Sequence, residues 1–195
     1  MTVTTILGGL ALAGACGLNP MVALLVTGVL ERAGWIDLGH SWAAIGDTVW
    51  LAVFGLLYLS DFAIDRFAAG HGRRVHRGGV IVPPLVGALL FASDVGGGAS
   101  WIVAIVLGGG TAAALHGVRA ALRPARPVAA DARRDRRGPV PGLHTTTMSL
   151  LEDAAAVLLV VVAFSLPAIA GAFVLALLVA AAPAALRARH VVAAA

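Results

Sequence analysis

The chain alternates between long apolar stretches and shorter polar ones. The apolar runs cover residues 2–30, 42–67, 80–93, 100–122 and 154–186. A membrane helix needs about 20 apolar residues, because the hydrocarbon layer is about 30 Å thick and a helix rises 1.5 Å per residue. The last run is long enough for two crossings with a tight turn at Pro167–Gly171. The pattern therefore predicts an all-α, polytopic membrane helix bundle of about six segments.

Prolines and glycines break several of these segments, and the clearest break is Asn19-Pro20 in the first run. Asn is a good N-cap and Pro is favoured at the first position of a helix. We therefore expect one helix to end near Cys16 and another to begin at Pro20. The stretch from Val3 to Cys16 is too short to cross a bilayer. The sequence predicts either one broken helix or a re-entrant piece followed by a spanning piece.

Such a break can serve a function or only a packing role. A helix N-terminus within a membrane presents unpaired N–H groups and the positive end of the helix dipole. Transporters use such breaks to hold polar or anionic groups. The alternative is a packed kink whose backbone is satisfied by neighbouring helices.

Composition and charge agree with a lipid bilayer as the main partner. The chain is 59% hydrophobic, is 12% charged and has a mean hydropathy of +0.93, whereas a soluble domain carries about 25% charged residues. The chain has no lysine, and its arginines are concentrated in loops 66–78 and 119–147. The positive-inside rule places both loops and the C-terminus in the cytoplasm. We expect no nucleic-acid partner, because these arginines lie between apolar runs instead of on a folded basic face.

The same pattern gives the domain organisation. We expect a single transmembrane domain over residues 1–195, with N-terminal helices in 1–122, a basic cytoplasmic linker in 123–147 and a C-terminal helical hairpin in 148–190. Ser149 and Glu152 match a capping box, which predicts that the last apolar segment begins there. The lone Cys16 excludes a disulfide within one chain and is interpreted as a packed thiol.

Charged residues near the helix ends are the candidate site. Asp61 and Asp65 lie four residues apart and therefore share one face of a helix. A carboxylate within a membrane is costly and usually marks a pathway or a pair. The candidates for binding a substrate or ion are Asn19, Asp61, Asp65, His116 and Glu152, and those for a charge network are Arg66, Arg119 and Asp153. We assign no catalytic residue and no metal, and we expect no cofactor.

Five motifs occur in a distinctive order. They are Gly17-Leu18-Asn19-Pro20, Asp61 before Asp65-Arg66, Pro83 before Gly87-Ala88-Leu89-Leu90, His116 before Arg119, and Ser149-Leu150-x-Glu152-Asp153. In this order they resemble a bacterial membrane family, domain of unknown function 4126. The resemblance implies a membrane helix fold in the bacterial inner membrane, and it assigns no activity.

The chain departs from that family at two motifs. The family has Glu-x-x-x-Asp-Lys-x-Pro where this chain has residues 61–68, so the charges are kept but the proline is absent. The family also has Arg-Pro where this chain has Val82-Pro83. If that arginine pairs with the acids in relatives, the partner here must come from Arg77, Arg119 or elsewhere.

Three functions fit these observations. The first is a small ion- or proton-coupled transporter or channel, in which Asp61 and Asp65 bind the ion, Asn19 lines the site and Glu152 joins them. The second is a structural or accessory membrane protein whose charges form an interfacial salt-bridge network. The third is an enzyme acting on a lipid or lipid-linked phosphate, in which His116, Arg119 and the Asp61/Asp65 pair face the cytoplasmic headgroup layer. We expect no enzyme, because no nucleophile and base are paired in the sequence. A homo-oligomer enclosing a pathway is suggested by analogy.

Overall fold

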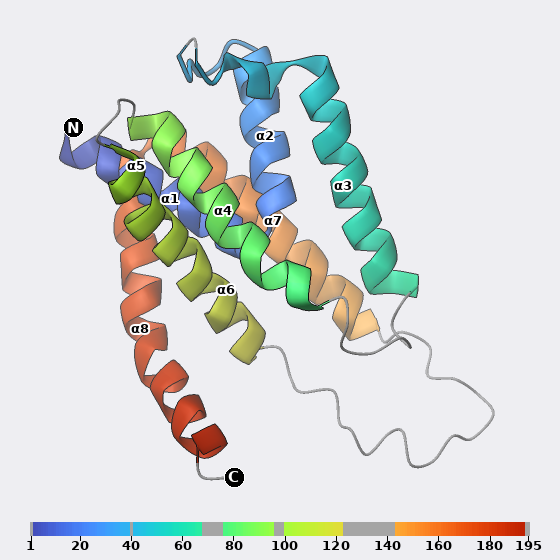
Figure 1. Ribbon diagram of the computed structural model, residues 1–195, viewed down its shortest axis with the longest axis vertical. Helices are drawn as coiled ribbons and strands as arrows, with labels where there is room; N and C mark the ends of the chain where they lie inside the picture. The colour runs from blue at the N-terminus through green and yellow to red at the C-terminus, as the bar shows by residue number, and fades with distance from the viewer. Residues whose placement is uncertain (1, 40, 68–75, 96–99, 123–142, 194–195) are drawn as a thin grey trace.

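Every element in the described part of the chain is a helix (Figure 1). The computed structural model describes residues 2–39, 41–67, 76–95, 100–122 and 143–193. The elements are α1 (Val3–Leu18), α2 (Pro20–Arg32), the 3₁₀ helix η1 (Ala43–Gly46), α3 (Thr48–Phe67), α4 (His76–Val95), α5 (Ser100–Val103), the π-helix η2 (Ala104–Gly109), α6 (Gly110–Leu122), α7 (Leu143–Ser165) and α8 (Pro167–Ala193). The predicted all-α class is thus confirmed for these residues. Most of both basic loops, including 68–75 and 123–142, lies outside them.

Helix α1 forms the centre of the bundle. Every residue from Gly8 to Gly17 is buried, and α1 contacts α4, α6, α7 and α8. Small residues permit this crowding. A Cβ atom on Gly9 would lie 2.8 Å from the Phe91 ring, and one on Gly17 would lie 2.8 Å from the Ala112 carbonyl oxygen. The glycine and alanine content of α1 therefore lets the helices around it approach closely.

The predicted break between the first two helices is confirmed. Helix α1 ends at Leu18, Asn19 is extended with φ −150° and ψ 105°, and α2 begins at Pro20. The start of α1 and the segment that follows α2 both lie toward the upper end of the bundle in Figure 1. The two helices, of 16 and 13 residues, rise only about 24 and 20 Å. The chain therefore enters the bundle along α1, turns at Asn19 and returns along α2.

Glycines also bring α4 close to the helix formed by α5, η2 and α6. A Cβ atom on Gly87 would lie 2.9 Å from the carbonyl oxygen of Gly108, and one on Gly108 would lie 2.7 Å from that of Gly87. These two glycines are therefore points of close helix approach. The contact includes η2, where the backbone widens to a π-helix over Ala104–Gly109.

Three predicted boundaries are wrong. Helix α7 begins at Leu143, so Ser149 lies inside it and is no capping residue. Amides in that turn bond to carbonyls of the preceding turn and need no side-chain cap. Helix α8 begins at Pro167, directly after Leu166, so the helices meet without the predicted turn at Pro167–Gly171. Helix α3 begins at Thr48 instead of Trp42, because η1 precedes it.

The outer surfaces of several helices are strongly apolar. The exposed large side chains include Val49, Leu56 and Leu59 on α3, Ile102, Ile105 and Val106 on α5 and η2, and Ile169, Phe173 and Val179 on α8. Among the described residues, Trp101–Ala120 is long and apolar enough to cross a membrane, while Val3–Leu18, Thr48–Ala63, Val80–Asp94 and Pro167–Pro183 are apolar but shorter. Large apolar side chains thus lie exposed on the outer faces of these helices.

Candidate functional site

The break at Asn19 organises a buried polar site. The Oδ1 atom of Asn19 accepts hydrogen bonds from the backbone N–H groups of Met21 at 3.1 Å and Val22 at 3.3 Å. Asn19 is only 7% exposed, so these first amides of α2 would otherwise be buried without a partner. Its Nδ2 atom donates a 2.7 Å hydrogen bond to Oδ1 of Asp153 on α7. One side chain thus caps α2 and ties the break to α7.

Asp153 receives a neutral donor on each of its oxygens. In addition to Asn19 on Oδ1, the Tyr58 hydroxyl of α3 donates a 2.9 Å hydrogen bond to Oδ2. Asp153 is 9% exposed. Burying a carboxylate is costly unless it is hydrogen-bonded or paired. The two donors come from different elements, so this carboxylate joins α3, α7 and the α1–α2 break.

Arg119 of α6 holds the neighbouring acid and the end of α1. Its guanidinium forms a salt bridge with Glu152, with Nε–Oε2 and Nη2–Oε2 distances of 2.7 and 2.5 Å. Its Nη1 atom also donates to the carbonyl oxygen of Leu18, the last residue of α1. A cation at that position complements the negative end of the helix dipole. Both charged side chains are mostly buried, at 16% and 17% exposure, so the pair is only partly screened by solvent.

We call Asn19, Tyr58, Arg119, Glu152 and Asp153 the break cluster. Its two acids are adjacent in sequence but have different partners: Glu152 pairs with a cation, and Asp153 accepts from neutral donors. The described part of the chain holds no group of three or more His, Cys, Asp or Glu side chains placed to hold a metal ion. The interactions of the cluster are hydrogen bonds to one buried carboxylate and a salt bridge to the adjacent one.

The structure brings together four of the eight residues singled out in the sequence, namely Asn19, Arg119, Glu152 and Asp153. Asp61 is exposed on α3, one turn after Tyr58, and His116 is partly buried on α6, one turn before Arg119. The backbone N of His116 would lie 3.3 Å from a Cβ atom on Gly17, which places it close to the end of α1. Asp65 and Arg66 belong to α3, but their side chains lie outside the described part of the structure.

Sequence reasoning missed Tyr58. It is the single tyrosine of the chain, and it lies within an apolar helix three residues before Asp61. A buried tyrosine hydroxyl usually finds a hydrogen-bond partner. That rule signals a polar contact at Tyr58, although it cannot identify Asp153 as the partner.

Together these features define an all-helical protein with a polar cluster at a buried helix break. The chain matches the family described as a domain of unknown function (DUF4126) over residues 6–187, and it belongs to that family. No curated protein and no solved structure matches the chain. The family match includes every residue of the break cluster, and the resemblance inferred from the sequence is confirmed.

Proposed function

We propose that this chain is a multi-pass protein of the bacterial inner membrane. The apolar outer faces of α3 and α8 support this, since lipid would cover them. The ends of α3, α6 and α8 and the starts of α4 and α7 lie toward one end of the bundle (Figure 1). The arginine-rich segments 66–78 and 119–147 adjoin these helix ends. By the positive-inside rule this end faces the cytoplasm.

Within the membrane, we propose that the chain is a small proton- or cation-coupled transporter and that Asp153 is its exchanging group. The observation that carries this proposal is the bonding of Asp153 at the break: a nearly buried carboxylate held by Asn19 and Tyr58, while Arg119 pairs with Glu152. A charge on a buried carboxylate that is held by neutral donors is costly in an apolar setting. Binding a proton or a cation removes that cost, so loading and release at Asp153 can be coupled to movement of the break.

The other residues of the cluster then have supporting roles. Asn19 fixes the first turn of α2, and Arg119 fixes the last turn of α1 and neutralises Glu152. Asp61, exposed one turn from Tyr58 on α3, is proposed as a second ion contact nearer the basic end, together with Asp65 and His116. We propose no catalytic activity.

The test is flux into proteoliposomes across a panel of ions and metabolites. Wild type and Asp153→Asn are compared at equal protein content and with equal elution on gel filtration. Asparagine preserves the size of the side chain but cannot exchange a proton. Flux that is present in wild type and lost in the variant supports the proposal, and equal flux in both contradicts it.

A second candidate is a structural or accessory membrane protein. It is favoured by the way Arg119 joins Glu152 to the carbonyl of Leu18, which can hold the α1–α2 pair in place without any substrate. In that case neither protein carries flux, and exchanging the charges in Arg119→Glu with Glu152→Arg restores the folded state that either single change loses.

A further inference from the structure

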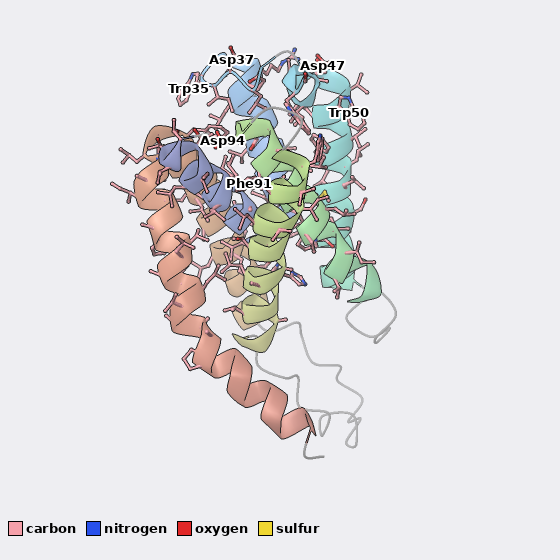
Figure 2. The ribbon with its side chains drawn as sticks, turned by 60° about the vertical axis from the view of Figure 1, so that its left-hand side comes forward. Trp35, Asp37, Asp47, Trp50, Phe91 and Asp94 are labelled. Carbon is pink, nitrogen blue, oxygen red and sulfur yellow. The ribbon has the colours of Figure 1, made fainter. Side chains whose placement is uncertain are left out.

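A separate cavity lies at the opposite end of α2 and α7 from the break cluster. It has a volume of about 470 Å³ and is bounded by the segment after α2, the end of α4 and the end of α7. Figure 2 shows Trp35 and Asp37 of the first wall above Asp94 of the second. Ser165 of the third wall lies twelve residues beyond Asp153 on α7, about 18 Å along the helix axis. The cavity is therefore distinct from the break cluster.

The segment that covers this cavity has a defined conformation. Glu31 accepts a 2.9 Å hydrogen bond from the backbone N–H of Leu38, whose side chain is 6% exposed. Gly34 and Gly39 flank the segment with φ of 70° and 76°, values that favour glycine. Asp37 accepts a 2.8 Å hydrogen bond from the N–H of Gly39 through Oδ1. These contacts fix the backbone of the segment that carries Asp37 and the largely exposed Trp35.

The polar side chains of the cavity are hydrogen-bond acceptors. Asp37 and Asp94 are the acidic residues that line the cavity, and the Oδ2 atom of Asp94 faces Gly8 of α1. Ser93 and Ser165 also line the cavity, but their hydroxyls donate to carbonyls of their own helices, at 2.9 Å in both cases. Their oxygens are left as acceptors. None of the described lining residues is basic. The matching ligand must therefore supply donors and positive charge.

The position of Asp94 is set by α1. A Cβ atom on Gly8 would lie 2.9 Å from the Oδ2 atom of Asp94, so the carboxylate fits against the helix only because residue 8 has no side chain. The remaining lining includes the aromatic rings of Trp35 and Phe164. An aromatic ring attracts a cation over its face, and the volume is within the range of small-molecule sites.

We propose that this cavity binds a small organic cation, a primary amine with an apolar body, between Asp37 and Asp94. The ammonium group donates hydrogen bonds to the two carboxylates, and the apolar body packs against Trp35 and Phe164. This binding does not depend on transport through the break cluster. In the proposed topology the cavity opens on the side of the membrane opposite the basic loops.

The test is isothermal titration of the full-length protein in phosphatidylcholine nanodiscs with phenethylamine and with 2-phenylethanol, its neutral counterpart. We expect phenethylamine to bind and the alcohol to bind at least about tenfold more weakly. The alcohol has no ammonium group, so the charge-assisted hydrogen bonds to the carboxylates are lost. Absence of phenethylamine binding, or equal binding of the alcohol, overturns the proposal.

Matched variants identify the site. Asp37→Asn is expected to weaken phenethylamine binding about tenfold, whereas Asp47→Asn, an exposed acid at the same end outside the cavity (Figure 2), changes it less than about twofold. Trp35→Leu is compared with Trp50→Leu in the same way, and only the first should weaken binding. Asp37 and Trp35 are both exposed, so their variants should fold. Equal effects of Asp37→Asn and Asp47→Asn contradict the proposal.

Discussion

The Nδ2 atom of Asn19 donates a 2.7 Å hydrogen bond to Oδ1 of Asp153, although 134 residues separate the two in the chain. The same asparagine caps α2 through its other atom. A local signal for a helix start is thereby coupled to a long-range contact with α7. The break and the buried acid depend on each other.

Replacing Asn19 tests that coupling. Asn19→Ala removes the cap of α2 and a donor to a buried carboxylate, so we expect it to reduce the free energy of unfolding by about 2–4 kcal/mol. Thr2→Ala is the matched control: Thr2 caps α1 by accepting from Thr5 N–H at 3.2 Å, but it is exposed and its side-chain hydrogen bonds are to Thr4 and Thr5 at the start of α1. Its loss should cost about 1 kcal/mol or less. Thermal unfolding in detergent compares the two, and equal shifts would show that only capping matters.

Arg119 and Glu152 should be strongly coupled. Arg119→Ala removes the cation that pairs with a mostly buried carboxylate and donates to the carbonyl of Leu18, so we expect a loss of about 3 kcal/mol. Arg119→Ala with Glu152→Ala should lose less than the sum of the two single changes, because the buried carboxylate is removed together with its cation. Chemical unfolding of the four proteins in the cycle measures this. Additive losses would mean that the salt bridge contributes little.

The close approach of α4 and η2 should not tolerate a methyl group. Gly87→Ala puts a Cβ atom 2.5 Å from that of Ala112 and 2.9 Å from the oxygen of Gly108, and overpacking of this kind costs about 1–3 kcal/mol. Gly110→Ala is the control, since nothing lies within 4 Å of its added Cβ atom. It should be neutral or stabilising by up to about 1 kcal/mol. Melting temperatures that fall equally in both variants would contradict the contact.

The proposed topology predicts which positions reagents reach. In intact cells a membrane-impermeant maleimide should label Asp37→Cys, and it should label Asp135→Cys only after lysis, because the second position lies in the basic segment expected in the cytoplasm. Cys16 should stay unlabelled in both, since it is 0% exposed. Labelling of both introduced cysteines from the same side would rule out the proposed topology.

The parts of the fold that depend on local chemistry could be predicted from the sequence. Asn19-Pro20 fixes a helix start by capping and backbone geometry, and the structure has the break there. Gly87 and Gly108 lie at a close helix contact that only their missing side chains permit. The capping pattern at Ser149 predicted the wrong helix start, because a capping motif does not begin a helix where the preceding residues are already helical.

The pairing of the cluster was harder to predict. Charged residues in apolar helices must find partners, which is why Arg119, Glu152 and Asp153 were candidates. The periodicity of apolar residues does not show which helices pack against each other. Asp61 was therefore the ion-binding candidate, Asp153 was placed only in a charge network, and Tyr58 was missed. The cavity beneath Trp35 was also missed, because three segments that are distant in sequence form it.

The central claim is that Asp153 exchanges a proton or cation, and proton flux driven by a pH gradient tests it most directly. Proteoliposomes would carry wild type, Asp153→Glu or Asp153→Asn, with Asp47→Asn as the exposed control. We predict that flux persists in wild type and the control, is reduced but measurable in Asp153→Glu, and is lost in Asp153→Asn while the protein stays folded. Wild-type flux in Asp153→Asn, or no flux of any ion in the wild type, would contradict the account.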